Sequence, residues 1–83
     1  MNRPYRSLSE CRRRLDTLTP AEKSTLLGLA QGFCCKEIAI SLGLSFKTPE
    51  RYRSNIYLKL GYNNPVQLTF FCLRLNLIKI PKT

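Results

Sequence analysis

The polar side chains between residues 45 and 60 could bind a polyanion. Cations and hydroxyl groups recur there at spacings that can place them on the outward face of one helix, opposite an inward stripe. The outward residues are Lys47, Arg51, Ser54 and Lys59, and the inward residues are Tyr52, Ile56 and Leu60. The whole chain shares this basic character, because 14 Lys and Arg against 5 Asp and Glu give a formal net charge of +9. We therefore expect an anionic partner, such as nucleic acid or an acidic membrane.

The chain lacks the residues that most catalytic and metal sites require. It has no His, 5 acidic residues, no paired carboxylates and no glycine-rich phosphate loop, so we expect no catalytic residue and no enzyme. Its 4 cysteines include no CxxC pair, so we expect no metal and no cofactor. Because Cys34 and Cys35 are neighbours, a disulfide framework is disfavoured and reduced thiols are expected. We interpret these two as small apolar fillers, with a redox-sensing pair as the alternative.

One small domain must position these side chains. A chain of 83 residues, of which 43% are hydrophobic, has room for a single core. The longest apolar stretch, residues 66–80, is interrupted by Arg74, Asn76 and Lys79, so we expect no segment that spans a bilayer. These features predict a cytoplasmic protein without a membrane partner.

Capping signals predict the first two helices. Thr19, a following proline and Glu22 can start a helix that Gly32 ends. A second helix over residues 36–42 leads to Gly43, where a sharp turn needs a positive φ. The residues expected to be buried on these helices are Ala21, Thr25, Leu26, Leu29, Ala30, Phe33, Ile38, Ala39 and Leu42.

Two further helices follow, so the fold class is all-α with four helices. The third runs from a Ser45 cap to about residue 60. The fourth runs from an Asn64 cap, with Pro65 at its first position and Gln67 reaching back, to about residue 75, and Asn76 favours a left-handed end.

The basic N-terminus allows two interpretations. Residues 1–17 carry 5 arginines with apolar residues at helical spacing between them, so they form either an extra short helix or a basic arm that does not fold alone. We expect the domain to span residues 18–78, with a tail over 79–83 in which Pro81 closes the ordered part.

The segment from residue 36 to residue 60 has the pattern of a helix-turn-helix. Such a motif requires a short turn, a small residue where the helices meet and an outward polar face, and Ala39, Gly43 and residues 47–59 supply these features. The following stretches together resemble, in order and spacing, the LuxR/FixJ (GerE-type) DNA-binding domain: Leu18-Thr19-Pro20-Ala21-Glu22, Ala30-Gln31-Gly32, Lys36-Glu37-Ile38-Ala39, Leu42-Gly43-Leu44-Ser45, Lys47-Thr48, Arg53-Ser54-Asn55-Ile56-Tyr57, Lys59-Leu60-Gly61 and Val66-Gln67-Leu68.

The resemblance covers residues 18–78 and implies a sequence-specific bacterial transcription regulator. It implies that the protein binds double-stranded DNA at an inverted repeat as a homodimer, with the third helix in the major groove and the fourth forming the dimer contact. A cytoplasmic protein of this kind would be nucleoid-associated when bound. By position, the resemblance places base reading on Glu50, Arg51 and Ser54, phosphate contacts on Lys36, Lys47, Thr48, Tyr52 and Lys59, and dimer contacts on Val66, Thr69, Phe70 and Leu73.

Pro49 departs from the family, which usually has a valine there. If Ser45 is the cap, Pro49 forfeits the first hydrogen bond of the helix. If Thr48 is the cap, the recognition helix loses a turn and Lys47 and Thr48 are displaced from the groove. The second arrangement predicts weakened sequence-specific DNA binding.

The segment that precedes the domain is another departure from the family. We expect a stand-alone domain, because only a basic segment of 17 residues precedes it, whereas most family members carry a receiver or ligand-binding domain there. The fourth helix is also more apolar than so small a core needs, so either it forms a partner surface or an N-terminal helix covers it. The alternative function is therefore an interaction protein that captures another LuxR-type regulator or an RNA polymerase subunit through the fourth helix.

Overall fold

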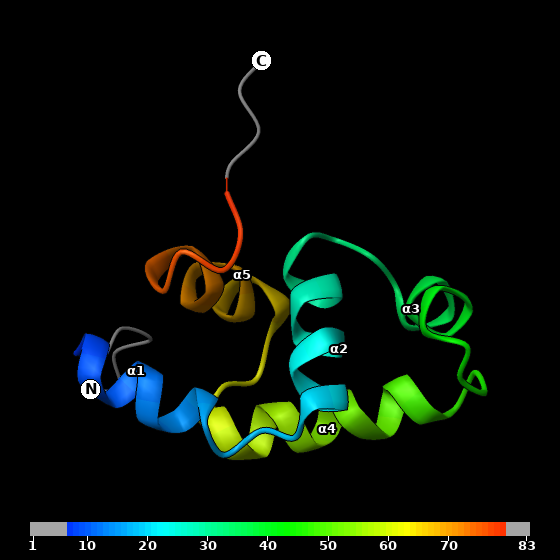
Figure 1. The fold of residues 1–83 in the computed structure, drawn as a ribbon, viewed down its shortest axis with the longest axis horizontal. Helices are drawn as coiled ribbons and strands as arrows, with labels where there is room; N and C mark the ends of the chain where they lie inside the picture. Colours follow the sequence, from blue (N-terminus) through cyan, green and yellow to red (C-terminus); the bar gives the residue numbers. More distant parts are fainter. Residues whose placement is uncertain (1–6, 80–83) are drawn as a thin grey trace.

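The computed structural model describes residues 7–79, and within this range the chain forms five α-helices and no strand (Figure 1). The predicted all-helical fold is confirmed, and the extra N-terminal helix is real over residues 8–15. Arg3 and Arg6 of the expected arm, and Pro81 with the rest of the tail after residue 79, lie outside the described residues. The helices are α1 (Leu8–Leu15), α2 (Pro20–Ala30), α3 (Cys35–Leu42), α4 (Thr48–Leu60) and α5 (Pro65–Arg74).

The predicted caps start α2 and α5. The Thr19 hydroxyl accepts a hydrogen bond from the Glu22 amide at 3.2 Å, and the Glu22 carboxylate accepts one from the Thr19 amide at 2.9 Å. In α5 the Asn64 side chain accepts from the Gln67 amide at 3.1 Å. The Gln67 side chain reaches back one residue further than expected, to the Asn63 amide at 2.8 Å. These local bonds satisfy amide groups that a helix start leaves without a partner.

Helix α4 begins at Thr48 with Lys47 in the cap position, so neither expected cap is correct. Ser45 belongs to the preceding turn, where its carbonyl accepts from the Thr48 amide at 3.1 Å. Pro49 is the second helical residue, and the first amide to bond within the helix is that of Arg51, to the Lys47 carbonyl at 3.3 Å. Because the first amides of any helix lack an internal acceptor, Pro49 forfeits no bond.

The core lies where α2 crosses α4 and α5. Helix α2 stands between α3 and α5 in Figure 1 and packs against α4, which runs along the lower edge of the view. Leu26 of α2, Ile56 and Leu60 of α4 and Leu68 of α5 are fully buried. Pro49 is also fully buried and joins the inward side of α4, which explains why a bulky polar residue would not fit there.

Two residues expected in the core lie at the surface instead. Phe33 is 49% exposed and Leu42 is 40% exposed. Phe33 follows Gly32, whose φ of +95° turns the chain away from the buried face of α2. Leu42 is the last residue of an eight-residue helix, of which Ile38 and Ala39 are the buried residues. Both predictions were wrong because helical spacing does not show where a packing partner ends.

The C-terminal helix ends as expected. Asn76 has a φ of +58°, and the Leu77 amide folds back to the Cys72 carbonyl at 2.9 Å. Phe71, Cys72 and Leu75 are buried in a cluster that also contains Cys11 of α1, so α1 covers part of the surplus apolar surface. Phe70 stays 43% exposed, so part of that surface remains open. Among the described residues, no helix has the length and apolar character needed to cross a membrane.

Candidate nucleic-acid interface

The outward face of α4 carries the three residues expected to read bases. Glu50, Arg51 and Ser54 are all exposed, whereas Ile56 and Leu60 on the opposite side are fully buried. Residues three and four apart on a helix share a face, so Arg51 and Ser54 project together. Helix α4 has 13 residues and is therefore about 20 Å long. This face is a rigid platform, because a packed stripe supports it from behind.

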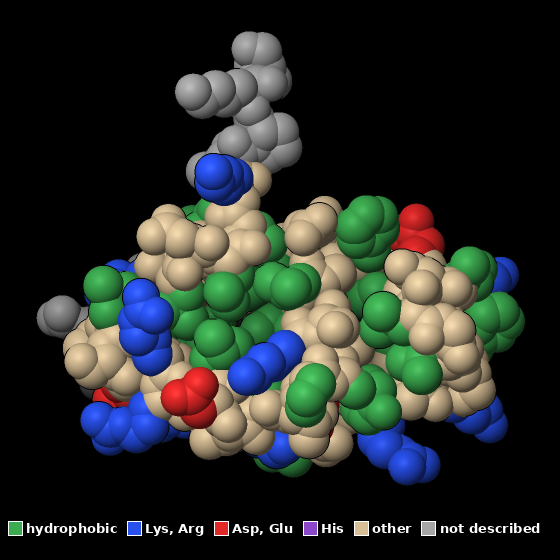
Figure 2. Space-filling model, viewed as in Figure 1, with side chains coloured by type: hydrophobic (Ala, Val, Ile, Leu, Met, Phe, Trp, Pro, Cys, Tyr) green, Lys and Arg blue, Asp and Glu red, His purple; other side chains and the backbone are tan. Residues whose placement is uncertain are grey.

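Further cations lie at the N-terminal end of α4. Lys47 is exposed at the cap, and the ammonium of Lys36 on α3 lies 5.7 Å from the centre of the Phe46 ring in the turn. The Thr48 hydroxyl pairs with that of Ser45 at 2.8 Å. Several lysine and arginine side chains in Figure 2 lie along the lower edge of the molecule, where Figure 1 places α1 and α4.

Two other expected phosphate contacts are partly engaged inside the protein. Tyr52 is half-buried. The Lys59 ammonium lies 2.7 Å from a carboxylate oxygen of Glu22, whose side chain is 4% exposed. Burial by itself would raise the pKa of Glu22. Hydrogen bonds from Lys59, the Thr19 amide and the Asn55 side chain, together with the charge of Lys59, lower that pKa below its usual value. Lys59 therefore ties α4 to the start of α2, and its contact with phosphate stays a prediction.

The turn between α3 and α4 holds the two helices of the motif in place. Gly43 ends α3 with a φ of +70°, and the Leu44 amide bonds to the Ala39 carbonyl at 2.8 Å. On the other side of α3, Ile38 packs against Gly28 of α2, where an added Cβ would lie 2.8 Å from an Ile38 carbon. One left-handed residue thus fixes the turn between α3 and α4, and one close approach fixes α3 against α2.

The cysteine pair begins α3, and its expected role is half right. Cys35 is half-buried, but Cys34 is exposed, so the interpretation of Cys34 as an apolar filler was wrong. Cys34 occupies the cap position, and its amide donates to the Glu37 carboxylate at 2.9 Å. That backbone hydrogen bond lowers the pKa of Glu37, and a hydrogen bond from the Cys34 side chain lowers it by a smaller amount. The backbone and Glu37 therefore compensate for a residue that is a poor cap. A redox role for the pair stays a prediction.

Comparison with known proteins places this arrangement in a family. Residues 16–72 match the model of bacterial regulatory proteins of the luxR family. The chain belongs to the LuxR family. The predicted resemblance is thus confirmed, and the α3–α4 pair is the helix-turn-helix of a LuxR-type DNA-binding domain of transcription regulators, a family that is not an enzyme class.

The LuxR-family relatives are longer than this chain. The transcriptional regulatory protein UhpA of Escherichia coli (strain K12) is 49% identical over 55 residues, which are 66% of this chain and 28% of UhpA. The response regulator Rre1 of Synechocystis sp. is 39% identical over 56 residues, which are 68% of this chain and 24% of Rre1. The chain thus spans about a quarter of the length of these relatives. The full-length FixJ structure from B. japonicum matches with a TM-score of 0.76 and 28% identity, over 86% of this chain and 35% of that one.

Three residues of or near the outward face of α4 were not predicted from the sequence. Leu58 is 81% exposed and lies on the same face as Arg51 and Ser54, seven and four residues further along α4. The spacing of seven residues between Arg51 and Leu58 could have predicted that the two share a face of the helix. Asn55 hydrogen-bonds to Glu22 across two helices, and no local pattern signals such a contact. The same holds for Arg14, which donates to the Lys59 carbonyl at 3.3 Å.

Proposed function

We propose that α4 enters the major groove of DNA and reads base edges with Glu50, Arg51 and Ser54. The observation that carries this proposal is the exposed Arg51 face of α4, supported from behind by the buried Ile56 and Leu60. An arginine can form a forked contact with guanine O6 and N7, a glutamate can accept from cytosine N4, and a serine suits either kind of edge. Leu58 on the same face offers the aliphatic surface that contacts a thymine methyl group.

The cations around α4 would hold the duplex without reading its sequence. Lys36, Lys47 and Thr48 lie at the start of the helix pair, so they suit phosphates on one side of the groove. Tyr52 and Lys59 are less available, because Tyr52 is half-buried and Lys59 is paired with Glu22. We expect smaller contributions from these two. Since Thr48 lies inside α4 and Pro49 costs no hydrogen bond, the helix keeps its first turn and the weakening expected from Pro49 is small.

The proposed dimer forms through α5 on an inverted-repeat site. Val66 is 61% exposed and Phe70 is 43% exposed, so α5 presents apolar surface to a second chain. Beside them lies a hollow of about 410 Å³, which Thr69 and Leu73 line together with the end of α2. Figure 2 shows apolar side chains gathered between α5 and α2. Thr69 also donates to the Ala30 carbonyl at 2.9 Å, so this residue serves the fold as well.

A selection experiment tests the reading function. Purified protein is titrated against a pool of random duplexes, bound sequences are recovered, and the Arg51→Ala variant is run alongside. We expect a selected inverted repeat with half-sites about 10 base pairs apart. Arg51→Ala should lose about 1 to 3 kcal/mol of preference at one base pair of each half-site. Lys23→Ala, which removes a charge from α2 outside the residues proposed to contact DNA or the second chain, is the matched control and should keep the preference.

Sequence-blind binding that is unchanged by Arg51→Ala would contradict the proposal. The exposed Val66 and Phe70 would then favour the alternative, in which α5 captures another LuxR-type regulator or an RNA polymerase subunit. Regulatory activity in the cell that depends on Phe70 and not on Arg51 would identify the capture role. In the cell, the proposed regulator would be cytoplasmic and associated with the nucleoid.

A further inference from the structure

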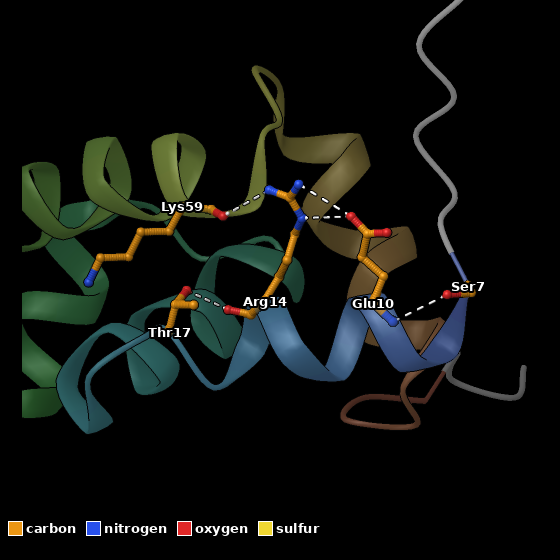
Figure 3. Close-up of polar contacts among 5 residues, drawn as sticks. All are labelled: Ser7, Glu10, Arg14, Thr17 and Lys59. Atoms are coloured by element: carbon orange, nitrogen blue, oxygen red, sulfur yellow. Dashed lines mark hydrogen bonds and ion pairs between the residues drawn. The ribbon is translucent and has the colours of Figure 1, made fainter.

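Helix α1 is fastened to the C-terminal end of α4. The guanidinium of Arg14 donates to the Lys59 carbonyl at 3.3 Å and holds the Glu10 carboxylate at 3.3 Å (Figure 3). Cys11 on the inner side of α1 is 1% exposed and belongs to the main core. The position of α1 relative to α4 is therefore set by both a polar and an apolar contact.

Both ends of α1 are also capped locally. The Ser7 hydroxyl accepts from the Glu10 amide at 3.2 Å, and the Thr17 hydroxyl donates to the Arg14 carbonyl at 2.6 Å. A helix of eight residues is too short to be stable alone, so these contacts and the core are what order it. The result is a rigid element where the sequence also allowed a loose basic arm.

This element presents arginines to solvent beside the recognition helix. Arg12 and Arg13 are both exposed, whereas Arg14 is turned towards α4. In Figure 1, α1 continues the lower edge formed by α4, and Figure 2 shows basic side chains along that edge. Within α1, Glu10 is the one acidic residue and is paired with Arg14, and the exposed Asp16 follows at the C-terminal cap, so Arg12 and Arg13 leave the outer surface of α1 with a net positive charge.

The width of the major groove determines which part of the DNA lies next to α1. The groove is about 12 Å wide, and an α-helix with its side chains is about 10 to 12 Å across, so a helix in the groove fills it. An element packed beside one end of that helix therefore lies over the phosphates that border the groove. Arginine side chains are long enough to donate to those phosphates and suit them in geometry.

We infer that α1 is a second DNA-contacting element, in which Arg12 and Arg13 bind phosphates at the border of the groove that α4 occupies. This inference rests on the proposed placement of α4 in the groove. It concerns a segment that lies before the part of the chain matched by the family, which begins at residue 16. The contact adds affinity for every sequence alike, because phosphates carry no sequence information.

The test is the salt dependence of binding to one mixed-sequence duplex, measured by fluorescence anisotropy. The variant Arg12→Gln/Arg13→Gln removes two charges and keeps good helix-forming residues. Each phosphate contact contributes roughly 0.9 to the slope of log affinity against log salt, so this variant should lose up to about 1.8 of the slope. Arg12→Lys/Arg13→Lys should retain most of it. The control Lys23→Gln removes a charge from α2, outside the residues proposed to contact DNA or the second chain, and should change the slope much less.

Several outcomes separate this inference from the proposed function. A slope for the Gln variant equal to that of the control would overturn the inference, even if Arg51→Ala still loses its base preference. Failure of the wild-type protein to bind any duplex would overturn both. Arginines in the last turn of a helix also stabilise it through the helix dipole, so thermal unfolding of every variant is recorded. Binding is then compared at a temperature where all variants are folded, so that lost stability does not pass for a lost contact.

Discussion

Glu22 is the residue through which the fold and the interface are most directly joined. Its carboxylate accepts one hydrogen bond from the Thr19 amide at the start of α2 and another from the Lys59 ammonium near the C-terminal end of α4. It is 3% exposed, so removing one partner would leave a buried carboxylate with less compensation for its burial. The same side chain thus caps α2 and anchors α4.

The lowered pKa of Glu22 predicts a pH-dependent contribution to stability. A carboxyl group whose pKa is lower in the folded state stabilises the protein above its unfolded pKa, and this contribution fades as pH falls through the folded value. The free energy of unfolding of the wild type should therefore exceed that of Glu22→Gln most at neutral pH. This difference in the free energy of unfolding should narrow below about pH 4.5, which is the ordinary pKa of a glutamate side chain. Urea unfolding of both proteins across this range measures the gap.

Lys59→Met is the control for that experiment. Methionine keeps the aliphatic length of Lys59 but removes its charge, so this variant should show a similar gap with a similar pH dependence if the ion pair is the cause. A gap for Glu22→Gln that stays constant from pH 7 to pH 3 would mean that the charge of Glu22 does not contribute.

At the scale of the helices, features set by residues close in sequence were predicted, and features set by residues distant in sequence were not. The starts of α2 and α5 were predicted well, because Thr19 with Glu22 and Asn64 with Gln67 lie within one turn of each other. The start of α4 was not, because it depends on the burial of Pro49 against other helices. Whether residues 8–15 form a helix or an arm was equally undecidable, since Arg14 contacts the Lys59 carbonyl, which is distant in sequence. The outward face of α4 was predictable because helical spacing alone separates its exposed side from its buried side.

Two glycines should respond in different ways to substitution by alanine. At Gly43 nothing lies within 4 Å of an added Cβ, but the φ of +70° disfavours any L side chain, so Gly43→Ala should cost about 1 kcal/mol through backbone strain alone. At Gly28 the alanine would gain about 1 kcal/mol of helix propensity, but its Cβ would lie 2.8 Å from Ile38. We therefore expect Gly28→Ala to move α3 against α2, whereas Gly43→Ala should leave their packing unchanged.

Amide chemical shifts and thermal unfolding distinguish the two cases. Gly28→Ala should change shifts throughout α3 and weaken DNA binding, while Gly43→Ala should change shifts near the turn and lower the melting temperature. The double variant Gly28→Ala/Ile38→Ala removes both Ile38 carbons that the new methyl group would meet, Cγ1 and Cδ1, and should restore the α3 shifts. Failure of this rescue would show that the contact between Gly28 and Ile38 does not set the position of α3.

For the molecule as a whole, net charge and apolar surface act in opposite directions on assembly. Each chain carries a formal charge of +9, so two chains that meet through α5 repel each other, while the apolar side chains of α5 favour contact. DNA supplies negative charge and relieves the repulsion. We therefore expect the free protein to dimerise weakly and the DNA-bound protein to pair readily.

This balance predicts that salt changes dimerisation and DNA binding in opposite directions. Between about 0.1 M and about 1 M salt the Debye length falls from about 10 Å to about 3 Å, so repulsion between chains is screened and sedimentation equilibrium should report a tighter dimer. Affinity for DNA should fall over the same range, because fewer counterions are released. Phe70→Glu should abolish the dimer at both concentrations. Ile40→Glu, which places the same charge on α3 on the other side of α2, should leave it intact. A dimer that loosens as salt rises would show that ion pairs hold the two chains together, and the apolar face of α5 would then need a different partner.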